Sequence, residues 1–270
     1  MSESATGEPV NAGAVADSDA GIDPSMLLSL RGVTKHFGAV QALRRVDLDV
    51  PAGQVTALVG DNGAGKSTLI KAVAGIWEPS SGTMYWQGKK IDIHTPKEAA
   101  LLGIATVYQD LALCDNLDIV ANMYLGFEST KNHVLDEITM EKRTQQTLKD
   151  LSVTTVHSVR QLVASLSGGQ RQSVAVARAV MRDAKLVIMD EPTAALGVSQ
   201  TAQVLALIKT LASRGIGVLV ISHNLNDVFE VADRVAVMYL GTLVSSGPVA
   251  NYTMSSTVDL ITTGVVSRAA

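Results

Sequence analysis

The chain has 270 residues, of which 47% are hydrophobic and 18% are charged, and its net charge is −4. This size and balance suit one large globular domain or a domain of two lobes, and the negative net charge argues against a nucleic-acid-binding protein. The single cysteine, Cys114, excludes a disulfide framework, and we expect it to be an inert thiol. The five histidines and the cysteine form no close metal-ligand cluster along the sequence.

The first 25 residues differ in composition from the rest of the chain. They contain five acidic residues and no Lys or Arg, so they lack the positive start and the apolar run of a signal peptide. We predict a disordered acidic tail over 1–25, a folded domain over 26–270 and a location in the cytoplasm.

The chain from residue 27 onward alternates short strands with helices. Apolar and polar residues alternate at 27–37 and 42–50, which predicts half-buried antiparallel strands, and a hairpin that turns at Gln87-Gly88 is predicted at 83–91. Apolar runs predict buried strands at 53–60, 103–108, 185–190 and 215–222. Helices are predicted at 66–76 (with Leu69, Ile70, Val73 and Ile76 on one face), across most of 111–165, at 168–183 and at 198–214. Strands that alternate with helices imply a parallel sheet, so the fold class is α/β.

A stretch of 24 residues, 235–258, carries no charge and is long enough to cross a bilayer. It contains Gly241, Gly247, Pro248 and many Ser/Thr, and 235–246 is typical of a β-hairpin. We therefore expect no transmembrane helix, so that any membrane role would come from a partner.

The sequence GDNGAGKS matches the phosphate-loop pattern G-x-x-x-x-G-K-[ST]. In this pattern the glycines let backbone amides surround phosphate oxygens, the lysine reaches the β- and γ-phosphates, and the hydroxyl binds Mg²⁺. A glycine-rich turn is the alternative, but a strand that ends at Val59 and a helix that begins near Lys66 favour a nucleotide site. The expected nucleotide-binding residues here are Gly60, Asp61, Asn62, Gly63, Ala64, Gly65, Lys66, Ser67 and Thr68.

Two carboxylates follow one of the predicted buried strands. Because ligands of open α/β sheets bind at the carboxyl ends of strands, we expect Asp190 to hold Mg²⁺. Glu191, expected on the opposite side of the chain, would accept a proton from an attacking water, although it could also be a surface acid. Gln109 and His223 follow two other apolar strands, and four such strand ends at one edge would assemble a phosphoryl-transfer site.

The residues LSGGQ, 166–170, precede a predicted helix. Ser167 and Gln170 fit the S-x-x-Q capping box, which alone would explain a well-capped helix. A capping box does not require Gly168 and Gly169, whereas glycines suit the close approach of a bulky group and bare amides at a helix N-terminus bind anions. A cap and a phosphate contact are therefore both possible at this point.

With these motifs in this order, the chain over about 27–265 resembles the ATPase subunit of an ATP-binding cassette (ABC) transporter. GDNGAGKST resembles Walker A, Gln109 the Q-loop, LSGGQ the signature, VIMDEP Walker B and His223 the H-loop. Phe37 corresponds to the A-loop aromatic that stacks on adenine. The resemblance implies a P-loop NTPase core with a mixed, mainly parallel sheet and an antiparallel β subdomain, plus an inserted α-helical subdomain at about 110–175.

The resemblance also implies cofactors and catalytic roles. It implies ATP and Mg²⁺, with Ser67, Gln109 and Asp190 as metal ligands. Glu191 would be the general base, His223 would contact the γ-phosphate, and Gln109 would link the core to the helical lobe.

Assembly is a further implication of the resemblance. Two cassettes of this family pair head to tail, so we expect a homodimer in which one chain's signature contacts the nucleotide held by the other. The residues expected to act in trans are Ser167, Gly168, Gly169 and Gln170. One departure is that Leu196-Gly197 stands where the family usually has Leu-Asp, which bears on coupling between the two sites.

A narrower resemblance links the chain to ATPases of monosaccharide importers of the ribose, xylose and fructose type, through VTKHFGAVQAL, EPTAALGV and DLITTG. It implies ATP-driven sugar import, two transmembrane permease subunits, an extracytoplasmic sugar-binding protein, no nucleic acid, and a peripheral position on the cytoplasmic face of the inner (plasma) membrane. Residues 117–127 would either line a groove for a permease helix or form lobe core. The alternatives are an ABC importer of a non-sugar solute, a soluble ABC ATPase acting on ribosomes or DNA, and a binding module with an inactive ATPase.

Overall fold

The computed structural model describes residue 23 and residues 25–265, so the predicted acidic tail lies almost entirely outside the described residues. The centre of the fold is a six-stranded sheet with the order β12-β11-β3-β10-β9-β6. Neighbouring strands pair in parallel, except that β12 is antiparallel to β11. The strands are β3 (Val55–Gly60), β6 (Ile104–Val107), β9 (Leu186–Asp190), β10 (Gly217–Ile221), β11 (Arg234–Tyr239) and β12 (Thr242–Pro248). The mainly parallel sheet and the β11-β12 hairpin predicted from the sequence are confirmed.

A second, antiparallel sheet has the order β2-β1-β4-β5. Its strands are β1 (Met26–Phe37), β2 (Val40–Pro51), β4 (Ser81–Trp86) and β5 (Lys89–Ile91). The predicted turn at Gln87-Gly88 is confirmed, with φ of +50° and +76°, as in the two-residue turns that suit the twist of a hairpin. The start of β1 is more buried than expected, because Leu27 packs against Gly217 of the central sheet.

The helices are α1 (Lys66–Val73), α2 (Pro96–Leu102), α3 (Ile119–Tyr124), α4 (Glu137–Asp150), α5 (Gly168–Val180), α6 (Val198–Ser213), α7 (Leu225–Val231) and α8 (Met254–Thr263). Two short 3₁₀ helices lie at Val163–Ser165 and Val249–Asn251, and a small hairpin is formed by β7 (Thr130–Lys131) and β8 (Val134–Leu135). Among the described residues, none of these helices is long and apolar enough to cross a membrane.

Two of the predicted helices are wrong in extent. The helix predicted at 66–76 ends at Val73, because Gly75 adopts a φ of +70° against the carbonyl of Thr95, and Ile76 is 42% exposed instead of on the buried face. The segment 111–165 is helical only in α3, α4 and one 3₁₀ turn, since left-handed residues such as Asn132 and His133 turn the chain into the β7-β8 hairpin.

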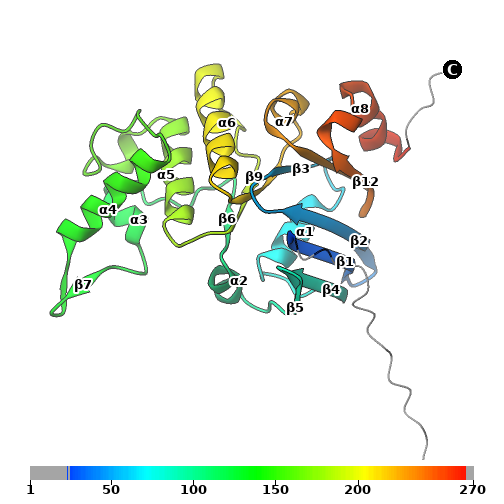
Figure 1. Ribbon diagram of the computed structural model, residues 1–270, viewed down its shortest axis with the longest axis horizontal. Helices are drawn as coiled ribbons and strands as arrows, with labels where there is room; N and C mark the ends of the chain where they lie inside the picture. Colours follow the sequence, from blue (N-terminus) through cyan, green and yellow to red (C-terminus); the bar gives the residue numbers. More distant parts are fainter. Residues whose placement is uncertain (1–22, 24, 266–270) are drawn as a thin grey trace, which may run out of the picture.

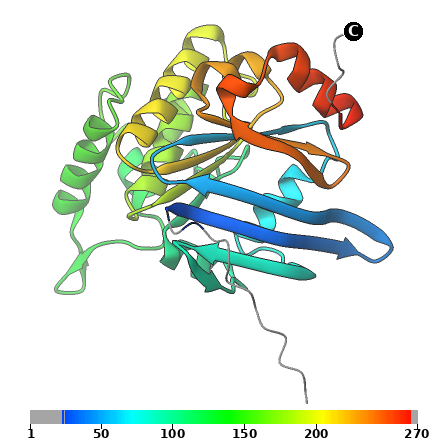
Figure 2. The same cartoon turned by 45° about the vertical axis from the view of Figure 1, so that its right-hand side comes forward.

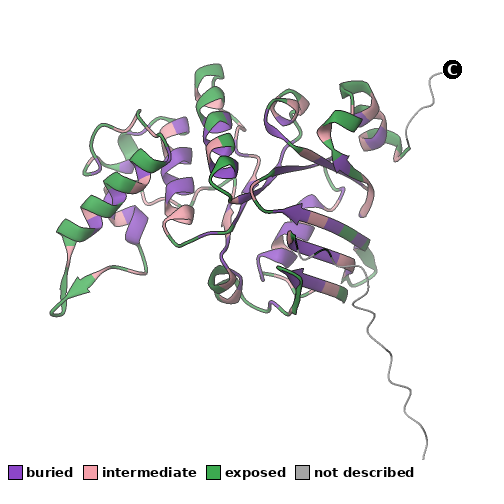
Figure 3. Cartoon of the chain, viewed as in Figure 1, coloured by how far each residue is buried: buried purple, intermediate pink, exposed green. Residues whose placement is uncertain are grey.

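The strands of the central sheet are buried on both faces. Successive residues of β10 join different core clusters: Val218 and Val220 pack on one side, and Leu219 and Ile221 on the other. Buried side chains of α5, α6, α7 and α8 belong to the first cluster, and those of α1 and the antiparallel sheet to the second. Figures 1 and 2 show these two layers on opposite sides of the sheet, and Figure 3 shows the buried strands between them.

Helices α3 and α4 lie to one side of this layered core, next to α5 (Figure 1). Their buried residues, including Ile119, Met123 and Leu148, join the cluster that covers the central sheet. The division of the chain into a folded domain at 26–270 and a helical subdomain at about 110–175 stays a prediction.

Candidate nucleotide site

Four neighbouring parallel strands end at the same edge of the central sheet. The paired residues Leu58↔Ile221, Ile221↔Asp190 and Val107↔Met189 bring the ends of β3, β10, β9 and β6 to one level. The phosphate loop, His223, the Asp190-Glu191 pair and Gln109 follow these strands directly. The structure therefore gathers the predicted phosphate, acid and polar residues along one edge.

The glycines of the phosphate loop are required for different reasons. At Gly60 a Cβ would overlap the carbonyl oxygen of Met238, and at Gly65, with a φ of +103°, it would lie 2.8 Å from the carbonyl oxygen of Ala42. Gly63 has open space around it but a φ of +81°, which favours glycine. Two of the glycines thus let neighbouring backbone approach, and the third shapes the turn.

Lys66 is buried inside this loop. Its Nζ donates hydrogen bonds to the carbonyl oxygens of Gly60 at 2.7 Å and Asp61 at 2.9 Å. Burial lowers the pKa of Lys66, and the nearby carboxylates of Glu191, Asp61 and Asp190 oppose that shift. The ammonium group is thus held where a phosphate would replace the two carbonyl oxygens.

The two carboxylates at the end of β9 have different surroundings. Burial, and next the charge of Glu191, raise the pKa of Asp190, while Lys66 and Lys71 oppose the rise. Glu191 Oε2 lies 2.8 Å from His223 Nδ1. The Glu191 carboxylate is 17% exposed and the imidazole 72% exposed.

The backbone at Glu191 departs from the expected alternation. Its φ is +50°, so the strand geometry that would send successive side chains to opposite sides ends at Asp190. The charges of both carboxylates act on the same lysine, Lys66.

Gln109 and Phe37 lie in exposed positions. Gln109 directly follows Tyr108, whose pKa is raised mainly by burial. The ring of Phe37 is packed edge-on against Trp77, with 4.7 Å between ring centroids. Trp77 was missed from the sequence, because its only local signal is an aromatic residue soon after α1.

The capping box of LSGGQ is formed. The amide of Gln170 donates to Ser167 Oγ at 3.4 Å, and the amide of Ser167 donates to Gln170 Oε1 at 2.8 Å. The two glycines have different environments. Gly169 is buried, and a Cβ there would lie 3.0 Å from Gln200 Cβ on α6, whereas Gly168 is exposed and a Cβ would meet the flexible end of Leu196. Close packing between α5 and α6 within one chain thus accounts for Gly169.

Gly197 occupies the N-cap position of α6, so no side chain caps the start of this helix. A Cβ at this position would meet nothing within 4 Å, and its φ of −74° is open to any residue. The glycine is therefore not required by local packing, although it stands where the family usually has an aspartate.

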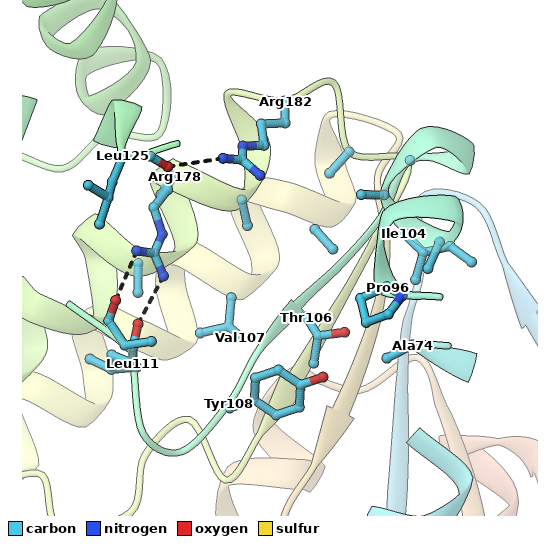
Figure 4. Close-up of a pocket in the computed structure, with 18 of the residues that line it drawn as sticks. Ala74, Pro96, Ile104, Thr106, Val107, Tyr108, Leu111, Leu125, Arg178 and Arg182 are labelled. Atoms are coloured by element: carbon cyan, nitrogen blue, oxygen red, sulfur yellow. Dashed lines mark hydrogen bonds between the residues drawn. The ribbon is translucent and has the colours of Figure 1, made fainter. Parts of the chain in front are cut away.

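A cavity of about 280 Å³ lies beside Gln109, between β6, α2 and α5 (Figure 4). Tyr108 and Asp110, the neighbours of Gln109, line it, as does Leu125 at the end of α3. Arg178 donates to the carbonyl oxygens of Leu111 and Ala112 at 3.0 Å each. The cavity is thus in direct contact with the segment that follows β6.

Arg182 also lines the cavity. Its guanidinium lies 3.7 Å from the centre of the Phe127 ring and donates to the carbonyl oxygen of Leu125 at 3.5 Å. Burial lowers the pKa of Arg178 and Arg182, and the charge of Arg182 adds to the shift at Arg178. Within residues 25–265, neither guanidinium makes an ion pair with a carboxylate.

Comparison with known proteins identifies the family to which this chain belongs. Residues 43–194 match the family model described as ABC transporter. The fructose import ATP-binding protein FrcA of Rhizobium meliloti is 46% identical over 243 residues, which cover 87% of this chain and 94% of that protein. The xylose/arabinose import ATP-binding protein XylG of Sulfolobus acidocaldarius is 46% identical, over 82% of this chain and 87% of that protein. The ribose import ATP-binding protein RbsA of Caldanaerobacter subterraneus subsp. tengcongensis is 37% identical, over 87% of this chain and 47% of that protein.

Solved structures agree with the sequence relatives. The ADP conformation of MJ1267, an ATP-binding cassette of an ABC transporter, superposes with a TM-score of 0.76 at 27% identity, over 88% of this chain and 95% of that one. A nucleotide-free ATP-binding cassette from an ABC transporter gives a TM-score of 0.74 at 29% identity, over 83% and 91%. This chain therefore belongs to the ABC transporter family, and it is an ATP-binding cassette of that family that hydrolyses ATP.

Proposed function

We propose that this chain is the ATP-hydrolysing subunit that drives the import of a monosaccharide through a membrane ABC transporter. The observation that carries the proposal is the 46% identity, over most of both chains, to import ATP-binding proteins named for fructose and for xylose/arabinose. Both relatives are matched along 87% or more of their own length, so the likeness is not limited to a shared phosphate loop. Import of a non-sugar solute is the competing possibility.

The charged residues at the sheet edge have distinct roles in the proposed hydrolysis. Lys66 exchanges the carbonyl oxygens of Gly60 and Asp61 for the β- and γ-phosphates of ATP. Glu191 leaves its contact with His223 and accepts a proton from the water that attacks the γ-phosphate. His223, which is largely exposed, then stabilises the charge on the γ-phosphate.

The same edge has the donors that a magnesium ion requires. Asp190 is a partly buried carboxylate, to which the structure gives no hydrogen bond or ion pair among the described residues. A cation would compensate this charge, and the hydroxyl of Ser67 and the amide oxygen of Gln109 supply further oxygen donors, as Mg²⁺ prefers. Within residue 23 and 25–265 no cluster of three His, Cys, Asp or Glu residues is present, which fits an ion held by few protein ligands and by phosphates. Bound Mg²⁺ would neutralise charge on the phosphates during transfer.

A homodimer completes the proposed site. The first amides of α5, at Gly168 and Gly169, have no partner within the helix, and Gly168 is exposed. We propose that Ser167, Gly168 and Gln170 contact the γ-phosphate held by a second copy, while Gly169 chiefly allows α5 to pack on α6. A post-hydrolysis structure of the cassette MJ0796 bound to ADP and Pi, with a TM-score of 0.68 at 25% identity, is dimeric, which supports the homodimer.

The cavity beside Gln109 is the proposed contact with the membrane subunits (Figure 4). Two permease subunits would hold the ATPase dimer at the cytoplasmic face of the inner membrane, and an extracytoplasmic binding protein would deliver the sugar. Leu125, which lines the cavity and is 43% exposed, comes from the apolar segment 117–127. Because Arg182 has no carboxylate partner among residues 25–265, we expect the docked permease segment to present an acidic residue there.

Reconstitution tests this proposal. The chain is combined in lipid vesicles with its cognate permease and sugar-binding protein, and ATP hydrolysis is measured with fructose, ribose, xylose, arabinose and galactose in turn. We expect one of these sugars to stimulate hydrolysis. Arg182→Glu should weaken co-purification with the permease, whereas Arg143→Glu, the same charge reversal on exposed α4, should not. Stimulation by a non-sugar solute alone would refute sugar import.

A further inference from the structure

Two loops carry the side chains of the proposed hydrolysis step. One follows β9 and contains Glu191, and the other follows β10 and contains His223. The strands pair at Asp190↔Ile221, and the amide of Glu191 donates to the carbonyl oxygen of Ile221 at 2.9 Å. The backbone therefore joins the loops at their base, but the two catalytic side chains lie beyond this point.

Two side-chain contacts connect the segment that follows β9 with the segment that follows β10, which includes the start of α7. One is the Glu191–His223 contact of 2.8 Å. In the other, the hydroxyl of Thr193 donates to Oδ2 of Asp227 at 2.6 Å, and both residues are partly buried. Asp227 lies in the first turn of α7, shortly after His223. Hydrogen bonds to an ionised carboxylate are shorter and about twice as strong as those between neutral groups.

The first bridge cannot persist during hydrolysis, a step that rests on the proposed function. Glu191 has to face the attacking water and His223 the γ-phosphate, so the two side chains have to separate. Of the hydrogen bonds and ion pairs of the described residues, the Thr193–Asp227 hydrogen bond is then the side-chain bridge that still joins the two loops.

The loop after β9 has strained backbone, although two turn hydrogen bonds lie within it, from the amide of Ala194 to the Glu191 carbonyl oxygen at 3.1 Å and from the amide of Leu196 to the Thr193 carbonyl oxygen at 3.3 Å. Glu191 and Ala195 have φ values of +50° and +60°, in the left-handed region that side chains disfavour. A space of only about 10 Å³ is lined by Pro192, Thr193 and Asp227 among others. Without the hydrogen bond, the loop could relax and move Glu191.

We propose that Asp227 is a positioning residue for ATP hydrolysis. Through the hydroxyl of Thr193 it holds the loop that carries Glu191 in register with the loop that carries His223, while these two side chains are separated and act on ATP. Asp227 itself contacts neither ATP nor the attacking water, so we expect its substitution to change kcat and not the affinity for ATP.

Steady-state kinetics of the full chain test the proposal. Thr193→Val removes the hydroxyl at nearly constant size, and Thr193→Ser keeps it. Thr139→Val is a matched control, because Thr139 makes the same kind of hydrogen bond to Asp136, at 2.8 Å, in the distant helix α4. We expect Thr193→Val to lower kcat about 10- to 100-fold, since a displacement of about 1 Å can cost about 100-fold. The KM for ATP, and kcat in Thr193→Ser and Thr139→Val, should stay within about twofold.

Asp227→Asn provides an independent variant should Thr193→Val not fold. It keeps an oxygen acceptor but loses the charge, and we expect kcat to fall at least about fivefold with KM unchanged. The kcat of the double variant Thr193→Val/Asp227→Asn should be no lower than that of the slower single variant, because both changes remove the same interaction. Strictly multiplicative effects would contradict the bridge.

A kcat within about twofold of wild type in Thr193→Val, or in Asp227→Asn if only that variant folds, would overturn the proposal. So would a rise in KM that matches the fall in kcat, or a failure of Thr193→Ser to restore turnover. Glu191→Gln is measured in parallel, to test the general-base role of Glu191 separately from the positioning role of Asp227. Turnover retained in Glu191→Gln refutes the proposed base itself, whereas an inactive Glu191→Gln beside an active Thr193→Val refutes only the positioning role.

Discussion

Ser167 has one role that the structure shows and a second that we propose, and substitution can separate them. Within one chain it caps α5. Its hydroxyl accepts a hydrogen bond from the amide of Gln170 at 3.4 Å, and its own amide donates to Gln170 Oε1 at 2.8 Å. In the proposed dimer its hydroxyl contacts the γ-phosphate bound by the other chain. Ser167→Ala removes both interactions of the hydroxyl. Ser167→Asp keeps a cap, but places a negative charge where the phosphate would bind.

The effect on the single chain is expected to be small. Loss of an N-cap costs about 0.5–2 kcal/mol, and the lower end applies to Ser167→Ala, because the hydroxyl bond is long and the reciprocal bond to Gln170 Oε1 uses only the backbone. About 0.5 kcal/mol corresponds to a fall in Tm of about 1–2 °C for a chain of this size. Ser167→Asp should melt at or slightly above wild type, since a carboxylate at a helix N-terminus contributes about 0.3–1 kcal/mol.

The effect on the dimer is expected to be large. Two like unit charges about 4 Å apart repel by about 4 kcal/mol at an effective dielectric constant of about 20. This energy corresponds to a decrease of about 10³-fold in the dimerisation constant for each composite site. Ser167→Asp should therefore be fully stable as a single chain and defective only in ATP-dependent pairing.

Thermal unfolding without nucleotide and sedimentation velocity with ATP measure the two effects. The sedimentation experiment uses the Glu191→Gln background, in which slow hydrolysis is expected to preserve the ATP-bound dimer. Should Ser167→Asp in that background still form a dimer as readily as Glu191→Gln alone, the signature does not face a nucleotide held by a second chain, and the head-to-tail arrangement is wrong.

Three further predictions concern the edge of the sheet. Glu191→Gln should bind ATP normally but lower kcat about 10²–10⁴-fold, the usual share of a general base; a kcat within a few-fold of wild type would exclude that role. Gly60→Ala should lower the free energy of unfolding by about 1–3 kcal/mol more than Gly63→Ala, because only a Cβ at position 60 meets the carbonyl of Met238. Equal free energies of unfolding for the two variants, measured with urea, would contradict this. Burial raises the pKa of Asp190 above 3.8, so its ionisation costs stability, and Asp190→Asn should raise the Tm of the nucleotide-free chain at neutral pH. This gain should shrink as the pH falls toward 3.8, and a Tm gain independent of pH would point to another cause.

Local signals in the sequence were sufficient wherever neighbouring residues determine the structure. The turn at Gln87-Gly88 and the capping box of Ser167 and Gln170 were predicted correctly, because each depends on residues at most three positions apart. The buried strands and the hairpin after residue 234 followed from hydrophobic periodicity and turn residues. The presence of the phosphate-loop residues was also clear, since the pattern is contiguous.

Predictions failed where distant residues override the local pattern. The periodicity of 66–76 favours a longer helix, but the approach of the Thr95 carbonyl to Gly75 ends it. The left-handed backbone of Glu191, with a φ of +50°, was likewise not predicted. Neither effect has a signal in the adjacent sequence.

The sequence by itself therefore determined the buried strands, the phosphate loop and the family, while the tertiary structure decided where several helices end and which side chains meet. The contacts of Glu191 with His223, of Thr193 with Asp227 and of Gly169 with α6 join residues about 30 positions apart. They exist because β9 and β10 become neighbours in register and because α5 packs on α6. Such pairings are set by burial of whole faces, which no short stretch of sequence specifies.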